Sequence, residues 1–193
     1  MISQLAARIS RAAHCAARFV LIGCIVAVMT GGSIAVSVAD TSSEILNAAA
    51  RGDAAQVTAL LSSGAKVEAR DRDGRTPLLL ATHGNHVEVA RLLIAAGADV
   101  NAKDSISDTP FLYAGAEGRN EILKMTLQAG ADLASTNRYG GTALIPAAHH
   151  GHPETVKILL GTGIKIDHVN RLGWTALIEA VSSAMAARST PRS

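Results

Sequence analysis

The chain has 193 residues, of which 48% are hydrophobic and 3% aromatic, and its 18 Lys and Arg against 16 Asp and Glu give a formal charge of +2. Three of the basic residues lie before position 40 and none of the acidic ones does, so 15 basic residues face 16 acidic ones from Asp40 onward. This near-neutral balance excludes the basic patch that nucleic-acid binding needs.

Residues 1–39 are predicted to be a signal peptide or an N-terminal membrane anchor. Arg8, Arg11 and Arg18 form a basic region, and an apolar run follows from Phe19 to Met29. Small residues precede Asp40, as a signal peptidase requires, so we expect cleavage after Ala39. The segment would then carry the rest of the chain out of the cytoplasm.

Three further readings of this leader stay open. The apolar stretch 19–38 is just long enough to cross a bilayer if it is not cut, with the repeats on the outer side because positive charge stays inside. Leu21-Ile22-Gly23-Cys24 resembles a lipoprotein box, and an organelle presequence is a last alternative. Cys15 and Cys24 both lie in the leader, so the remainder has no disulfide, no thiol nucleophile and no cysteine metal ligand.

A pattern with a period of 33 residues fills most of the chain after the leader. Three columns of matching residues show it: Thr76, Thr109, Thr142 and Thr175; Gly64, Gly97, Gly130 and Gly163; and Gly52, Asn85, Gly118 and Gly151. A fixed repeat of this length predicts a solenoid, in which each unit buries its apolar face only against its neighbours.

Each unit is expected to hold two short helices and a projecting turn. Thr76 can cap the first helix, and Pro77 suits its first position. The chain then turns back at Asn85, a residue that tolerates the left-handed conformation. The second helix has an apolar stripe at i, i+3, i+4 and i+7, formed by Val89, Leu92, Leu93 and Ala96. The polar stretch from Asp99 to Ser107 is predicted to be a hairpin-like turn between repeats.

The first and fifth units depart from the pattern. From Asp40 to about Asp73 the unit looks like an N-terminal capping repeat, whose first helix we expect to start at Ser42 or Ser43 with Glu44. The fifth begins correctly at Trp174, but residues 182–193 supply no second apolar stripe and are expected to be an irregular tail. Without that second helix, we expect the apolar surface near Ile158 and Leu159 to be poorly covered, with fraying or self-association at this end.

The repeated pattern G-x-TPL, A, GH-x-E-V, LL-x-x-GAD-V-N resembles the ankyrin repeat over residues 40–181, in particular that of a bacterial branch of exported ankyrin proteins. The resemblance implies an all-α solenoid of four repeats plus a truncated fifth. One departure is that the His of the family's TPLH motif is replaced throughout, by Leu79, Leu112, Ile145 and Ile178. Pro146 falls within the first turn or so of its helix, where it can remove one hydrogen bond.

The resemblance also implies a non-enzymatic binding module that acts in the periplasm, or on the inner membrane facing it if the leader is uncut. Its partner would be an unidentified protein, with no cofactor, no catalytic residue and no metal. Hairpin tips and the ends of the first helices form the concave binding face in this family. Carried over column by column, that face comprises Arg72, Asp73, Arg75, Ile106, Arg138, Tyr139, His149, His150, Arg171, Leu172 and Trp174. Tyr, Trp and Arg are the residues most enriched in binding hot spots, and Arg138 with Arg171 would guide an acidic or mixed partner.

Other functions remain as alternatives. His149, His150 and His152 could ligate a transition metal or handle haem, although His86 and His152 also occupy the family's Gly-His position at the helix turn. Acidic pairs such as Asp71 with Asp73 are expected to cap the turns. The chain could also be the remnant of a longer ankyrin protein whose gene carries a frameshift. No nucleotide-binding loop or hydrolase motif is present in the sequence.

Overall fold

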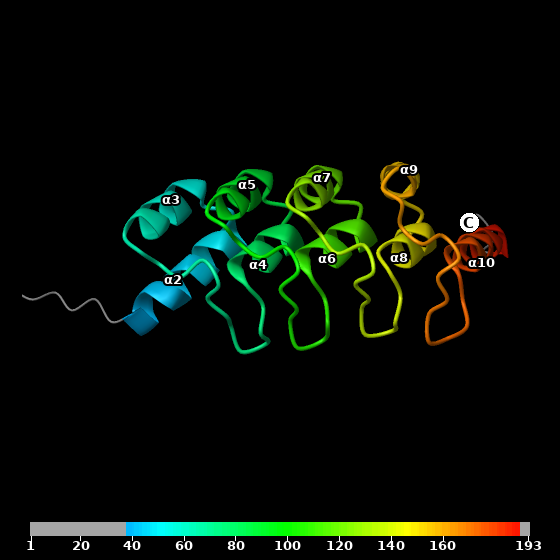
Figure 1. Cartoon of the computed structure of the whole chain (residues 1–193), viewed down its shortest axis with the longest axis horizontal. Helices are drawn as coiled ribbons and strands as arrows, with labels where there is room; N and C mark the ends of the chain where they lie inside the picture. Colours follow the sequence, from blue (N-terminus) through cyan, green and yellow to red (C-terminus); the bar gives the residue numbers. More distant parts are fainter. Residues whose placement is uncertain (1–37, 190–193) are drawn as a thin grey trace, which may run out of the picture. The chain divides into compact units, whose positions relative to one another are not determined.

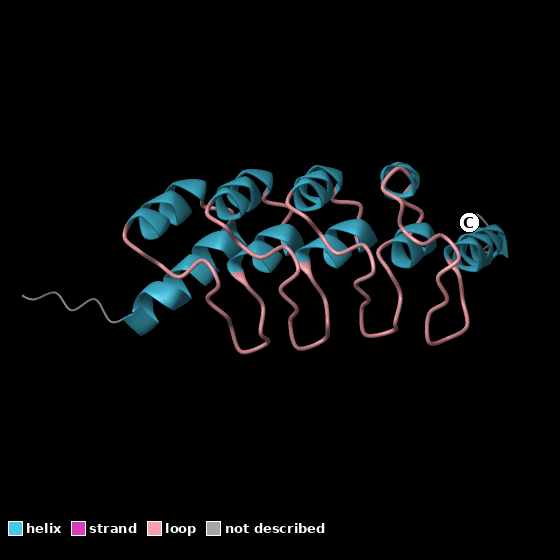
Figure 2. Ribbon diagram, in the orientation of Figure 1, coloured by secondary structure: helices cyan, strands magenta, loops and turns pink. Residues whose placement is uncertain are grey.

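The computed structural model of the protein describes residues 38–189, so nearly all of the expected leader, with its cleavage or anchoring, lies outside the described residues. The described part is all-helical and contains no strand, as predicted (Figure 2). Its helices are α2 (Val38–Arg51), α3 (Ala54–Ser62), α4 (Pro77–His83), α5 (Val87–Ala95), α6 (Pro110–Ala116), α7 (Asn120–Gln128), α8 (Leu144–His149), α9 (Pro153–Leu160) and α10 (Ala176–Ser189).

The helices of residues 38–189 form two layers (Figure 1). Helices α2, α4, α6, α8 and α10 pack in succession as an inner row, and α3, α5, α7 and α9 form the outer row. Each inner helix and the outer helix that follows it make one repeat, so α2 and α3 are repeat 1, α4 and α5 repeat 2, α6 and α7 repeat 3, α8 and α9 repeat 4, and α10 begins repeat 5. Four connections project from the same side of the inner row, and we call them hairpins 1 to 4: residues 63–76, 96–109, 129–143 and 161–175. The core lies between the two rows, where Leu78, Phe111 and Leu144 are almost completely buried.

Two residues of the threonine column cap the inner helices α4 and α6 as predicted. Thr76 Oγ1 accepts a hydrogen bond from Leu79 N, and Thr109 Oγ1 accepts one from Leu112 N. The expected left-handed turn between the two helices of a repeat is also present, since the column that contains Asn85 has φ values between 55° and 75°. These two signals position the helices of each repeat.

One side chain at the base of each hairpin holds its tip together. Asp71 Oδ1 accepts hydrogen bonds from the backbone N–H groups of Asp73 and Arg75, both at 2.9 Å. The equivalent residues of the other hairpins make the same pair of bonds, and they are Asp104, Asn137 and Asn170. Local side-chain bonds of this kind stabilise turns, so Asp71 has the capping role expected for it, and Asn fills the same role in hairpins 3 and 4.

Pro146 changes the start of α8. In repeat 2 Leu80 N donates to Thr76 O, but Pro146 occupies the equivalent position in repeat 4 and has no N–H. Ile145 N donates to Thr142 O instead, at 3.2 Å. The Thr142 hydroxyl is therefore left buried without a hydrogen-bond partner among the described residues.

Both ends of the repeat array differ from expectation. Helix α2 begins by Val38, before the start expected at Ser42 or Ser43. Residues 182–189, expected to be irregular, continue α10 without a turn, because Ala184 stands where the other repeats have Gly or Asn. Leu159 is fully buried and Ile158 packs against the core, but Leu160 beside them is 47% exposed, so the poorly covered apolar surface expected near these residues lies at Leu160.

Across residues 38–189, no helix is both long enough and apolar enough to cross a membrane.

Candidate functional site

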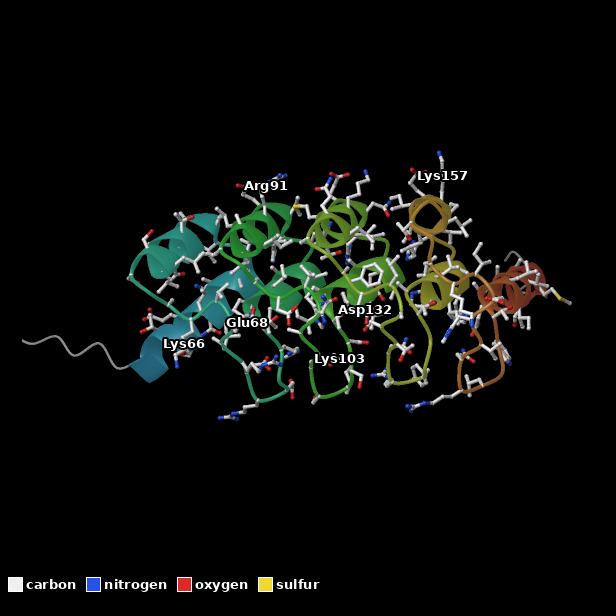
Figure 3. The ribbon with its side chains drawn as sticks, in the orientation of Figure 1. Lys66, Glu68, Arg91, Lys103, Asp132 and Lys157 are labelled. Atoms are coloured by element: carbon white, nitrogen blue, oxygen red, sulfur yellow. The ribbon has the colours of Figure 1, made fainter. Side chains whose placement is uncertain are left out.

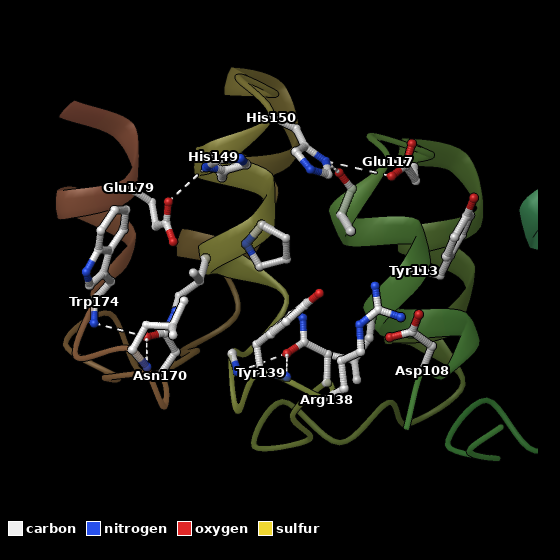
Figure 4. A pocket seen from close by; sticks show the side chains of 17 residues that line it. Asp108, Tyr113, Glu117, Arg138, Tyr139, His149, His150, Asn170, Trp174 and Glu179 are labelled. Carbon is white, nitrogen blue, oxygen red and sulfur yellow. Dashed lines mark hydrogen bonds and ion pairs between the residues drawn. The ribbon is translucent and has the colours of Figure 1, made fainter. Parts of the chain in front are cut away.

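A pocket of about 550 Å³ opens on the hairpin side between the third, fourth and fifth repeats. Its walls come from α6, α8 and α10 and from hairpins 2, 3 and 4. Figure 4 shows Tyr113 and Glu117 on one wall, Trp174 and Glu179 on the opposite wall, and Arg138 with Tyr139 at the hairpin edge. Ile145 and Pro146 of α8 also line it and add apolar surface.

The structure brings six of the eleven predicted face residues together in this pocket: Arg138, Tyr139, His149, His150, Leu172 and Trp174. Arg72 and Arg75 line a separate recess of about 560 Å³ beside hairpin 1. Asp73, Ile106 and Arg171 line neither of these two hollows. The predicted face therefore divides into two places, and the larger group of residues surrounds the pocket of repeats 3 to 5.

The charges at hairpin 1 are engaged within the hairpin. Arg75 Nε lies 2.8 Å from Asp71 Oδ2, and its NH2 lies 2.9 Å from Asp73 Oδ2. Burial disfavours the charged form of Asp71, but hydrogen bonds and the positive charge from Arg75 outweigh it and lower the pKa of that carboxyl. Arg75 thus stabilises the tip together with Asp73, a role that the sequence reasoning assigned to the acidic pair but not to Arg75.

Hairpins 3 and 4 are joined to each other through Arg171. Its backbone N donates to Tyr139 O at 2.9 Å, and its guanidinium donates to Arg138 O at 3.1 Å. The Arg138 guanidinium lies over the Tyr139 ring, 4.9 Å from the ring centroid. Arg138 and Tyr139 are both exposed. Hairpin 3 therefore presents a cation and an aromatic ring at the pocket edge, and hairpin 4 fixes their backbone through Arg171.

The α6 wall carries acidic and phenolic groups. Burial, followed by the nearby charge of Asp104, raises the pKa of Asp108. Burial and then the carboxylate of Glu117 raise the pKa of Tyr113. No hydrogen bond or ion pair joins the Asp108 carboxyl to another described residue within 41–185. The pocket thus combines an available carboxyl group with aromatic surface.

A neutral histidine supports the Tyr113 ring from the neighbouring repeat. The His83 ring stacks on Tyr113 with the ring centroids 3.8 Å apart. Burial, and then the positive charge of Arg75, lowers the pKa of His83, so the ring is neutral at pH 7. This stack fixes the position of Tyr113.

The histidines at the end of α8 have separate partners. His149 Nδ1 lies 2.8 Å from Glu179 Oε2 on α10, and His150 Nδ1 donates to Ala116 O on α6 at 2.7 Å. The centroids of these two rings are 5.3 Å apart and the rings are tilted. Within the described part of the chain, no three His, Cys, Asp or Glu side chains are grouped so that they could hold a metal ion.

The hydrogen bond expected at the Gly-His position is made by His86, whose Nε2 donates to Ala50 O, at the end of the preceding inner helix, at 3.1 Å. His152 is the equivalent residue two repeats later, and its ring packs near Gly118 as that of His86 packs near Gly52. The carbonyl equivalent to that of Ala50 is Ala116 O, which His150 binds instead.

The sequence analysis missed one column that faces the hairpin side. It reads Leu80, Tyr113, Pro146 and Glu179, four residues after each capping threonine. Leu80 lines the recess at hairpin 1 and the other three line the pocket. A usable signal was present, because this column varies in chemistry from repeat to repeat, while the position two residues before it stays large and apolar as Leu78, Phe111, Leu144 and Leu177. The outer helices differ from the inner ones in direction: their charged side chains, such as Arg91 and Lys157, point away from the hairpins (Figure 3).

The fold and site define a class of protein: a solenoid of helix pairs with hairpins, whose hollow face is built from several successive repeats. A model of the family described as ankyrin repeats (3 copies) matches residues 14–104, 45–137 and 111–188. The chain belongs to the ankyrin-repeat family. Repeats of this family are protein–protein interaction modules.

Solved structures agree with this assignment, and 515 of their chains match. One is the crystal structure of an ankyrin repeat domain from Acinetobacter baumannii AYE, which is 55% identical, with a TM-score of 0.70. The match covers 72% of this chain and 71% of that chain. No curated protein matches the chain.

Proposed function

We propose that the pocket of repeats 3 to 5 is the partner-binding site, and that it takes an extended segment of another protein. The observation that carries this proposal is the gathering of Tyr139, Leu172 and Trp174 around one hollow on the hairpin side. All three side chains are exposed. Aromatic anchors in a preformed site bind with a small loss of conformational entropy.

The charges around the pocket favour a partner segment of mixed character. Arg138 offers one positive group at the rim, whereas Asp108 and Glu117 offer carboxyl groups on the α6 wall. Arg171 is held against hairpin 3 by its hydrogen bond to Arg138 O, and its positive charge adds to that of Arg138. An apolar or aromatic side chain packed between Trp174 and Ile145, with a basic neighbour near Asp108, satisfies these groups together.

Affinity capture from a bacterial extract tests this site. The wild-type chain is immobilised beside the double variant R138A/Y139A, and R72A serves as a matched control because it removes a hairpin-tip arginine outside the pocket. Both altered positions are exposed, so the circular dichroism melts should match. We expect one protein to be retained by the wild type and R72A and lost with the double variant. Equal retention by a folded double variant would remove the assignment.

The second part of the proposal is export to the bacterial periplasm. It is supported by the basic, apolar and small-residue order of residues 1–39 and by the likeness to a bacterial ankyrin domain. Fractionation of cells that express the full chain tests it: soluble periplasmic protein beginning at Asp40 is expected. Protein found in the cytoplasm at full length would contradict export.

A further inference from the structure

Helix α10 exposes apolar residues that the same pattern buries in every earlier repeat. Leu177 is 73% exposed, whereas the equivalent residues of the earlier inner helices are at most 2% exposed: Leu78, Phe111 and Leu144. Ile178 is 47% exposed, and its equivalents are at most 5% exposed: Leu79, Leu112 and Ile145. At α10, side chains of the kind that form the core between earlier repeats are therefore exposed, and no further repeat covers them among the described residues.

The end face carries a ridge and a groove side by side. Leu177, Val181 and Met185 are four residues apart, so they lie along one side of α10, and all three are exposed. Beside this ridge is a hollow of about 560 Å³ between α9 and α10, in the position that a fifth outer helix would fill. Leu177 belongs to both the ridge and the hollow.

Charge does not oppose the burial of this face. None of the residues that line the hollow is Asp, Glu, Lys or Arg. Between Ala176 and Met185 the sequence has one charged residue, Glu179, and that carboxylate is engaged with His149 toward α8. Contiguous apolar surface of this kind marks an interaction site.

The described part of the other end has no matching apolar surface. Between residues 41 and 105, no large apolar side chain is exposed, so these residues do not repeat the exposed face of α10. A ridge next to a groove on the same face can instead pair with itself around a twofold axis, each ridge lying along the partner's groove. Such an isologous contact closes after two copies.

We propose that the protein forms a symmetric dimer through the end face, here defined as the exposed side of α10 with the hollow between α9 and α10. The pocket of repeats 3 to 5 lies on the hairpin side and stays open in each copy. The dimer would thus present two copies of that pocket.

Sedimentation velocity of the full chain over a range of concentrations tests this proposal. We expect a dimer for the wild type and for I106E, a control with an apolar residue replaced on a hairpin tip. We expect L177E to sediment as a monomer, with self-association weakened about 100-fold, tenfold for each of the two copies. Leu177 is exposed, so L177E should keep the helical circular dichroism of the wild type. A monomeric wild type, or a wild-type oligomer that L177E leaves unchanged, would overturn the proposal.

Cysteine cross-linking gives a second measurement that does not depend on disrupting the interface. In a chain with Cys15 and Cys24 replaced by Ser, V181C places a thiol at the middle of the ridge, close to its own copy across the axis. Mild oxidation should give a covalent dimer with V181C and none with I106C. Equal cross-linking of the two variants, or none with V181C, would contradict the twofold arrangement.

Discussion

His149 on α8 and Glu179 on α10 form a polar link between the inner helices of the fourth and fifth repeats, with Nδ1 2.8 Å from Oε2. The Glu179 carboxylate can only accept, so the His149 Nδ1 carries the hydrogen. Ser183 Oγ lies 3.3 Å from the same nitrogen. Both residues of the link line the pocket, so the contact that attaches the fifth repeat also shapes the proposed site.

Replacing His149 with Ala should loosen α10. The Glu179 side chain is only 10% exposed, and a buried carboxylate without its partner costs about 1 to 3 kcal/mol. We expect a loss of that size in the free energy of unfolding measured with urea, and faster hydrogen exchange in α10. K157A, on the exposed face of α9, is the control and should leave both unchanged. An H149A variant as stable as the wild type would show that the link contributes nothing.

Replacing Pro146 with Ala should stabilise the fourth repeat. The new N–H can donate to Thr142 O, as Leu80 N does to Thr76 O, and Ile145 N becomes free to bond the Thr142 hydroxyl. A threonine cap contributes about 0.5 to 2 kcal/mol. Thermal and urea unfolding check the gain. If the cap is its source, adding T142A should cancel it; a gain that survives T142A would point to backbone strain alone.

Asp108 should make the protein less stable as the pH rises. Burial raises the pKa of Asp108 in the folded state, so the folded protein holds this proton more tightly than the unfolded chain does. Stability is then lost as the pH rises from the unfolded pKa through the folded one. We expect D108N to be more stable than the wild type at pH 7 and equal to it at pH 3. A difference that does not change with pH would rule out this carboxyl as its source.

Asp71 should show the opposite dependence. Its pKa is lowered in the folded state because the bonds and charge of Arg75 outweigh burial. Its contribution is present above the unfolded pKa and is lost as the pH falls through the folded one. D71N keeps the capping oxygen, as Asn137 shows in hairpin 3, and loses only the ion pair. We expect it to cost below about 1 kcal/mol at pH 7, because this pair is partly exposed, and progressively less as the pH falls through the folded pKa.

The periodic residues were enough to predict the scaffold. Thr76, Asn85 and their equivalents act through local backbone chemistry, so helix caps, turns and projecting hairpins follow directly from the pattern. The loss of one helix hydrogen bond at Pro146 could also be predicted from the sequence, because proline has no N–H. That this loss leaves the Thr142 hydroxyl unpaired becomes visible only when the hydrogen bonds in the first turn of α8 are compared with those of α4.

The site was predictable only in part, because its details depend on contacts between repeats. The sequence placed Arg75 among the binding residues, but it did not show that the Arg75 guanidinium is paired with Asp71 and Asp73. It assigned a hydrogen bond at the helix turn to His152, whereas in the structure His150 donates to Ala116 O. Tyr113 was missed because it lies inside the helical pattern, where a lining residue and a core residue look alike.

Trp174 allows the most direct test of the central claim, that the pocket of repeats 3 to 5 binds the partner. It is the only tryptophan of the chain and lines the pocket. A peptide from the captured partner, chosen without tryptophan, is titrated against the full chain while the tryptophan emission is recorded. We predict a saturable shift of the emission for the wild type and R72A and a weaker affinity for R138A/Y139A. Tight binding by calorimetry with no change at Trp174 would place the site elsewhere and contradict the account.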